Sequence, residues 1–241
     1  MGTSQSFGLK SSPNWSSAKR AITNIAKGTG DNNRNSGNFM NSFSQALAGD
    51  VYRGGGGGGR TSFGHAGART TKNFVSFVNS VQGGGLAFAL GLDQMQPDER
   101  PRTKEDFIDE IIKYVEGEND ATIDDGAAAC AFRKVLLEIL KDCETAEDIE
   151  NVLKTADDDR MASWIITFEV EYILEYSGVI FQDHIFSKSG NPQAVLGEIR
   201  RWLHRELDNR YADEMKQIDF NSPEGKAYLD ELTSKILDVW Q

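Results

Sequence analysis

Six consecutive glycines, flanked by Arg53 and Arg60, constrain the fold of this chain more than any other stretch. Glycine loses more backbone entropy on ordering than any other residue, so no buried helix or strand is expected across residues 54–59. The run therefore predicts a flexible joint. The chain before it is rich in Gly, Ser and Asn, and the chain after it has strong helical periodicity. We expect a partly helical amino-terminal arm over residues 1–66 and one acidic helical domain over residues 67–241.

Charge divides the chain in the same way. Residues 1–80 contain nine Lys/Arg against two Asp/Glu, a net charge of +7, whereas the rest contains 17 against 35, a net charge of −18. An acidic domain repels nucleic acid, so any contact with phosphate groups would have to come from the arm. The alternative is that the basic arm folds back on the acidic domain, and the sequence leaves both open.

The arm contains two amphipathic segments. One follows a cap at Ser16 or Ser17, with apolar residues from Trp15 to Ile25 and a stop at Gly28; the other covers residues 38–51 and places Phe39 and Phe43 on one stripe. Neither is long enough to be a stable helix in water by itself. Each must pack either on the domain or on another protein, so Trp15, Phe39 and Phe43 are candidate partner-binding residues.

About seven helices are expected in the domain, which makes the fold class all-α. Three capping boxes, which begin at Thr103, Thr122 and Thr145, each precede an apolar helical stripe. The segment from Leu86 to Leu92 is almost wholly apolar and should lie deep in the core. The most hydrophobic helix, over residues 161–176, should end at Gly178, with a short strand or an extended loop over 179–186.

The sequence gives no reason to expect catalysis, a metal or a cofactor. The acidic clusters at 118–125 and 157–159 lack the ligand spacing of a calcium loop and are better explained as charges near helix starts. His65 is expected to be a solvated loop residue, and His184 and His204 have no ligand partner at helical spacing. No metalloprotease, serine-hydrolase or phosphate-binding motif is present.

The cellular location of the protein can be predicted from its sequence. No apolar run reaches the roughly 18 residues needed to cross a bilayer, and the amino terminus lacks a signal-peptide pattern. The two cysteines, Cys130 and Cys143, form no disulfide framework. A cytoplasmic location with no membrane contact is therefore expected.

The order of several segments resembles the B component of the Qat antiphage defence systems. The matching features cover roughly residues 1–145, and the last 95 residues match only as a generic helical tail. They are Met1-Gly-Thr-Ser4, the Gly-rich arm, Asn38 to Leu47, Gly67-Ala-Arg69 before Phe74 to Val81, Leu86 to Leu92, Phe107 to Val115, and Ile123-Asp-Asp-Gly-Ala-Ala128 before Phe132. The chain departs from the family at Phe7-Gly-Leu-Lys10 and Pro13-Asn-Trp15, where members carry a Gly-Pro-Gly and Pro-Pro-Trp rich start.

This resemblance implies a non-enzymatic subunit that works with an ATPase, an enzyme similar to the QueC deazaguanine synthase, and a TatD-like nuclease. It points to Gly2, exposed once Met1 is removed, as a modification site, with Thr3 and Ser4 as neighbouring contact residues. Two alternatives stay open: a structural adaptor that docks partners through its arm helices, and a nucleic-acid-binding protein that uses the basic arm.

Overall fold

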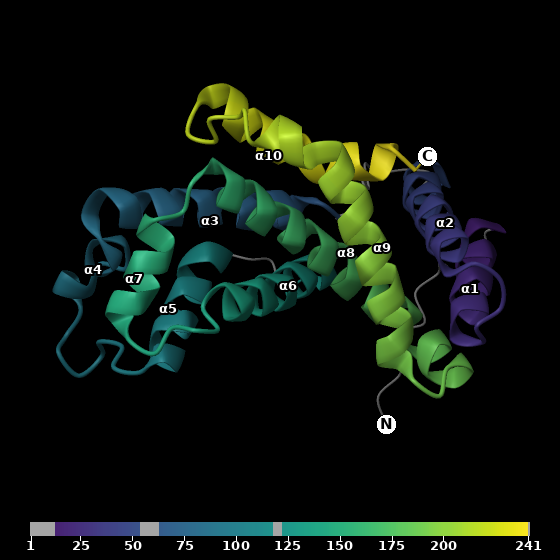
Figure 1. The fold of residues 1–241 in the computed structure, drawn as a ribbon, viewed down its shortest axis with the longest axis horizontal. Coiled ribbons are helices and arrows are strands. Elements are labelled where there is room, and N and C mark those ends of the chain that lie inside the picture. Colours follow the sequence, from purple (N-terminus) through teal and green to yellow (C-terminus); the bar gives the residue numbers. More distant parts are fainter. Residues whose placement is uncertain (1–12, 54–62, 118–121, 241) are drawn as a thin grey trace. The chain divides into compact units, whose positions relative to one another are not determined.

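The computed structural model describes residues 13–53, 63–117 and 122–240, and every regular element in these ranges is a helix (Figure 1). The all-α prediction is confirmed. The expected glycine joint at 54–59 lies outside the described residues. The helices are α1 (Pro13–Ala26), α2 (Asn32–Arg53), α3 (His65–Gly84), α4 (Leu86–Ala89), the 3₁₀ helix η1 (Leu92–Gln94), α5 (Lys104–Glu116), α6 (Ile123–Ile139), α7 (Ala146–Lys154), α8 (Asp158–Lys188), α9 (Pro192–Met215) and α10 (Pro223–Asp238).

The three predicted capping boxes are present in full. At the starts of α5, α6 and α7 the threonine hydroxyl accepts a hydrogen bond from the backbone N–H three residues on, at 3.1, 3.1 and 3.2 Å. The aspartate at that position accepts the threonine backbone N–H in return, at 2.9 Å in each case. These paired bonds satisfy donors that a helix start otherwise leaves open.

Four helix boundaries differ from those expected. Helix α2 begins at Asn32 and not near residue 38. Helix α1 begins at Pro13, where the fixed φ of proline suits a first helical position, and not after Ser16 or Ser17. His65, expected in a loop, is the first residue of α3. Helix α8 continues through Gly178 to Lys188, so residues 179–186 form neither a strand nor an extended loop. A glycine costs a helix only about 1 kcal/mol relative to alanine, and burial of Phe181 and Ile185 in the next turns outweighs that cost.

The chain divides into two compact units whose bounds differ from the expected boundary after residue 66. The first unit comprises Met1–Ser62, Ser177–Arg205 and Ser234–Gln241, and the second comprises Phe63–Tyr176 and Glu206–Thr233. Helices α8, α9 and α10 each contribute residues to both units. The arm helices therefore share a unit with segments from the carboxy-terminal third of the chain.

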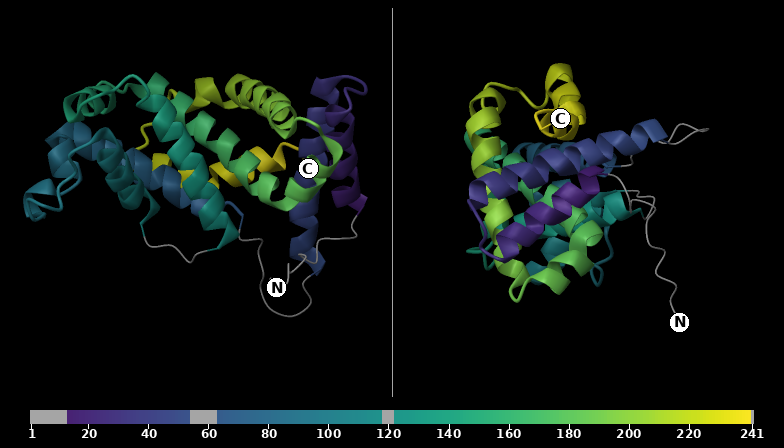
Figure 2. Two further views of the ribbon diagram at one scale, coloured as in Figure 1. Left: turned by 90° about the horizontal axis from the view of Figure 1, so that it is seen from below. Right: turned by 90° about the vertical axis from the view of Figure 1, so that its right-hand side faces the viewer.

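Each unit has its own helical core. In the first, α1 and α2 lie side by side, as the two views of Figure 2 show. In the second, α3 is the central helix and contacts α4, α5, α6 and α7 (Figure 1). Its buried face includes Phe74, Phe77, Val78 and Val81, the residues that the sequence pattern places on one stripe.

Candidate functional site

The predicted site residues fall into two groups. Gly2, Thr3 and Ser4 lie outside the described residues. Trp15, Phe39 and Phe43 are buried in the first unit, where they form an aromatic cluster with Phe181 of α8. The ring centroids of Phe181 lie 5.4 Å from Trp15 and 5.6 Å from Phe39.

This cluster shows that the arm helices pack on α8 of the same chain. Trp15 also meets Phe43 edge-on at 6.1 Å, and Phe39 stacks on Phe43 at 5.7 Å. His184 adds a polar link, since its Nε2 lies 3.0 Å from the Thr23 hydroxyl and 2.9 Å from the Lys19 carbonyl. The three arm aromatics thus pack inside their own unit, and a partner could reach them only if this cluster opened.

In the second unit, the start of α3 is capped by a carboxylate from a helix that lies far away in the sequence. Gly64, the residue before α3, has no side chain with which to cap it, and Asp124 of α6 takes that role. Its carboxylate accepts the backbone N–H of Ala66 at 2.9 Å and that of Gly64 at 3.3 Å. The hydroxyl of Tyr172 donates to Asp124 and accepts the Gly64 N–H at 2.8 Å. A carboxylate at a helix start is favoured because the helix dipole is positive there.

Phe63 reinforces this attachment. Its ring stacks on Tyr172 with centroids 4.8 Å apart and contacts Tyr176 at 4.3 Å. Phe63 and Gly64 are therefore fixed both by hydrogen bonds and by aromatic packing.

The adjacent carboxyl groups of Asp124 and Asp125, at the start of α6, have opposite pKa shifts. Burial raises the pKa of Asp124, although the bonds from Tyr172, Ala66 and Gly64 oppose this. For the neighbouring Asp125 a smaller burial effect is outweighed by bonds from Thr122 and Arg69, which lower its pKa to about 2. The guanidinium of Arg69 contacts the Asp125 carboxylate at 2.5 Å.

Glu169 of α8 is fully enclosed in the second unit. Burial raises its pKa to about 8, and the Thr233 hydroxyl donates to its carboxyl group, 3.1 Å from Oε2 and 3.3 Å from Oε1. The negative charge of nearby Asp124 acts in the same direction as burial. At neutral pH Glu169 is thus mostly protonated, and it stabilises the fold as a neutral hydrogen-bonding group.

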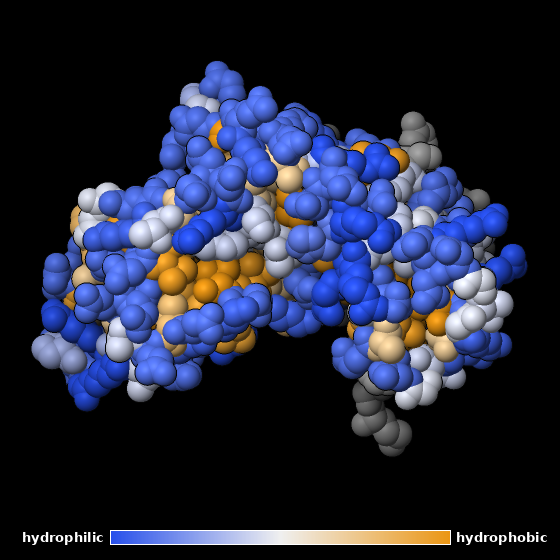
Figure 3. Space-filling model, viewed as in Figure 1, coloured by the Kyte–Doolittle hydropathy of each residue, from blue (hydrophilic) through white to orange (hydrophobic). Residues whose placement is uncertain are grey.

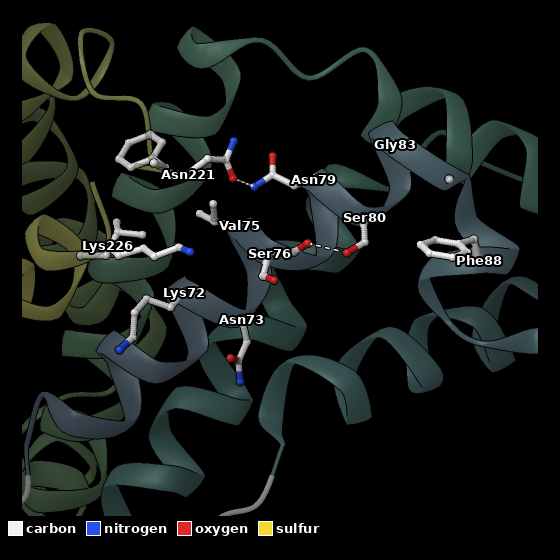
Figure 4. Close-up of a pocket in the computed structure, with 13 residues that line it drawn as sticks. Lys72, Asn73, Val75, Ser76, Asn79, Ser80, Gly83, Phe88, Asn221 and Lys226 are labelled. Atoms are coloured by element: carbon white, nitrogen blue, oxygen red, sulfur yellow. Dashed lines mark hydrogen bonds between the residues drawn. The ribbon is translucent and has the colours of Figure 1, made fainter. Parts of the chain in front are cut away.

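A groove of about 730 Å³ runs along α3 in the second unit (Figure 4). We call it the α3 groove. Its walls come from α3, from α4, from α10 and from the segment that leads into α10. The lining residues are Lys72, Asn73, Val75, Ser76, Asn79, Ser80, Gly83, Gly84, Phe88, Phe220, Asn221, Lys226 and Leu229.

Phe88 is the feature of the α3 groove that the sequence analysis placed wrongly. It was expected in the core with the rest of Leu86 to Leu92, but 69% of its surface is exposed. Ala87 is also exposed and Leu92 is half-buried, whereas Leu86, Ala89 and Leu90 are buried. Its ring rests against Gly84, because a Cβ on that glycine would lie 2.5 Å from Cγ and 2.9 Å from Cβ of Phe88. The glycine therefore makes room for the aromatic ring at this end of the groove.

The polar residues of the α3 groove include a pair of asparagines. The Asn79 side-chain amide donates to the side-chain carbonyl of Asn221, as the dashed line in Figure 4 shows. This leaves the carbonyl oxygen of Asn79 and the amide nitrogen of Asn221 without a further bond to any described residue. Two such atoms side by side present one acceptor and one donor.

A second groove in the same unit is more apolar. Figure 3 shows hydrophobic residues gathered at the surface between α6, α7 and α8, and a groove of about 420 Å³ there is lined by Val135, Ile139, Val152 and Trp164 among others. Leu137 on α6 is 46% exposed. Nothing in the described chain covers this groove.

Neither a metal site nor a membrane span emerges from the described ranges. Within them no group of three or more His, Cys, Asp or Glu side chains is placed to hold a metal ion. None of the helices described is both long enough and apolar enough to cross a bilayer.

Comparisons with known proteins add no relationship to this geometry. The chain matches no protein-family model, no curated protein and no solved structure.

The α3 groove could not be predicted from a sequence pattern, because residues that line it, such as Asn79 and Asn221, are 142 positions apart.

Proposed function

We propose that this chain is a non-catalytic subunit of a bacterial antiphage defence complex and that Gly2 is the acceptor of a covalent modification. The observation that carries the proposal is the ordered set of segments, from Met1-Gly-Thr-Ser4 to Ile123-Asp-Asp-Gly-Ala-Ala128, that resembles the B component of the Qat systems. The partners that follow are a QueC-like enzyme, an ATPase and a TatD-like nuclease.

The packing of α1 supports the presentation of the amino terminus to a partner. Trp15 is buried within three residues of the start of α1, so Pro13 has a fixed place in the first unit. Eleven residues, Gly2 to Ser12, precede it. Fully extended, they would reach at most roughly 36–40 Å from Pro13. That length is sufficient for the terminus to enter the active site of a bound enzyme.

The chemistry favours an α-amino group as the acceptor. Enzymes of the QueC class activate a deazaguanine carboxylate with ATP, and an amine then attacks the acyl adenylate. The new bond is an amide, and AMP and a proton leave. An α-amino group with a pKa of about 8 is substantially neutral at cellular pH, unlike a lysine at about 10.4. Glycine also offers the least steric hindrance next to that nitrogen.

The test is the intact mass of the protein made in cells with its neighbouring genes, compared with protein made alone. We expect a partner-dependent gain of the mass of a deazaguanine acyl group on the amino-terminal peptide. Gly2→Val should abolish the gain, whereas Gly8→Val, the same change in the same segment, should keep it. An intact adduct on the Gly2→Val protein would refute the assignment.

A second candidate function, a structural adaptor, is favoured by the open α3 groove, which no described part of the chain fills. Deletion of residues 1–6 separates the two functions. It should abolish defence if the terminus is a substrate, and should leave defence intact if the chain acts only as an adaptor.

A further inference from the structure

We infer that the α3 groove binds an extended acidic peptide segment of a partner protein, with an apolar side chain on Phe88. This inference rests on the adaptor role and is independent of Gly2. The α3 groove lies wholly within the second unit, so its geometry is set by that unit alone.

Charge is the first reason for an acidic ligand. The chain has 37 Asp and Glu residues and a net charge of −11, yet no carboxylate is among the residues that line the α3 groove. Two lysines line it instead. Lys72 is paired with Asp230, whereas Lys226 has no ion pair with any residue that the structure describes. An acidic side chain in the groove would give Lys226 a partner and would meet no like charge on the groove wall.

The paired asparagines are the reason for a peptide. Asn79 offers a carbonyl oxygen and Asn221 an amide N–H beside it, and in Figure 4 these two atoms point to the same side. A peptide backbone presents the complementary pair, an N–H and a C=O, along an extended strand. The asparagine pair can therefore form two hydrogen bonds with the backbone of a bound segment, whatever its side chains.

Phe88 determines where the bound peptide should carry an apolar residue. Figure 4 places Lys226 and Phe88 on opposite sides of the Asn79–Asn221 pair. Asn79 and Gly84, on which the Phe88 ring rests, are five positions apart on α3, or about 7.5 Å along the helix axis. Two residues of an extended chain span about 6.6 Å. The expected ligand thus has an apolar residue about two positions from the peptide group held by the asparagines, and an acidic residue on the other side.

The experiment selects binders from a phage library of random twelve-residue peptides on the full-length protein. We expect the recovered peptides to combine acidic residues with an aromatic or aliphatic one at this spacing. The affinity of a synthetic, fluorescein-labelled peptide from the selection is then measured by fluorescence anisotropy. It should fall roughly tenfold or more for Lys226→Glu and for Phe88→Ala, and it should weaken as salt is raised.

Two matched controls keep the result specific. Lys113→Glu makes the same charge change on the exposed face of α5, outside the α3 groove, and should leave affinity within a factor of about two. Gly84→Ala should displace Phe88 and weaken binding, whereas Gly126→Ala, at a helical glycine outside the groove where an added methyl group meets no atom within 4 Å, should not. The thermal unfolding of each variant shows that it remains folded.

Three results of the peptide experiment would overturn the inference. The selection could yield no binder, it could yield peptides without acidic enrichment, or the selected peptides could bind Lys226→Glu and Phe88→Ala as tightly as the wild type. Self-association that Phe88→Ala abolishes would also overturn it, because the groove would then be an interface between copies. If any of these occurs while partners still copurify with the chain, the adaptor role stands and only the assignment of the groove fails.

Discussion

Gly67 of α3 and Tyr172 of α8 are in such close contact that no larger residue fits at the glycine. A Cβ on Gly67 would lie 2.8 Å from Cδ1 and 3.0 Å from Cζ of the tyrosine ring, and closer still to Cε1. The same tyrosine donates its hydroxyl hydrogen bond to Asp124, which caps α3. The ring therefore cannot move away from an added methyl group without disturbing that cap.

Gly67→Ala should destabilise the protein by about 1–3 kcal/mol, the usual range for overpacking a core. Gly126→Ala is the matched control: Gly126 is also inside a helix, but an added Cβ there meets no atom within 4 Å. That change should stabilise the fold by up to about 1 kcal/mol, because alanine favours a helix over glycine. Urea unfolding followed by circular dichroism measures both. Equal effects of the two changes would contradict the close packing.

The buried carboxyl of Glu169 should make stability fall as pH rises. In the unfolded chain this group loses its proton near 4.5, and in the folded protein burial raises its pKa to about 8. Between these values the folded protein binds the extra proton, so raising the pH lowers the free energy of unfolding. The loss begins near pH 4.5 and is complete somewhat above pH 8.

Glu169→Gln removes this titration and keeps a group that can bond Thr233. From pH 5.5 to pH 8.5 the unfolding free energy of the wild type should therefore fall relative to that of Glu169→Gln. Glu150→Gln serves as the control, since the Lys154 ammonium and the Leu86 N–H lower the pKa of Glu150 and keep it ionised throughout that range. A difference for Glu169→Gln that does not change with pH would show that its carboxyl titrates normally.

Phe181→Ala should loosen both arm helices at once, because this ring contacts Trp15, Phe39 and Phe43. The expected cost is about 3–5 kcal/mol, typical of removing a buried phenylalanine. Hydrogen exchange of backbone amides in α1 and α2 should accelerate. Ser187→Ala, at an exposed position in the same stretch of α8, should leave exchange unchanged. Unaltered exchange in the Phe181→Ala protein would mean that the arm helices are held by other contacts.

The two thiols should differ in reactivity. Cys130 is exposed, whereas Cys143 is buried, and burial raises the pKa of the Cys143 thiol. Because the thiolate is the reactive form, Ellman's reagent should titrate one thiol rapidly and the other only on unfolding. Cys130→Ser should remove the rapid phase, and Cys143→Ser should preserve it. A rapid phase that survives Cys130→Ser would show that Cys143 is accessible.

Features determined by neighbouring residues could be predicted from the sequence. The threonine–aspartate boxes that start α5, α6 and α7 are local, and so is the apolar stripe of α3. The continuation of α8 through Gly178 was missed because a glycine after an apolar helix also fits a helix end, and only the burial of Phe181 decides between the two.

The residues of the candidate site depend on contacts between distant segments, which a sequence pattern does not reveal. Asp124 was assigned to the start of α6 from its neighbours, yet its carboxylate caps α3, nearly 60 residues earlier. The exposure of Phe88 depends on the space left by Gly84 beneath its ring. A continuous apolar run could not separate the exposed Ala87 and Phe88 from the buried Leu86, Ala89 and Leu90.

The bonds from Asp124 and Tyr172 to Gly64 and Ala66 also bear on how the gene can vary. Every glycine codon begins with two guanines, so a run of six is repetitive DNA, which gains and loses units readily during replication. Doubling the length of a connecting segment costs only roughly 0.6 kcal/mol in closure entropy. Since α3 is capped from outside its own segment, its register does not depend on how many glycines precede it. Natural variants with more or fewer glycines should therefore differ in the length of the segment before α3. The structure of the second unit should stay the same.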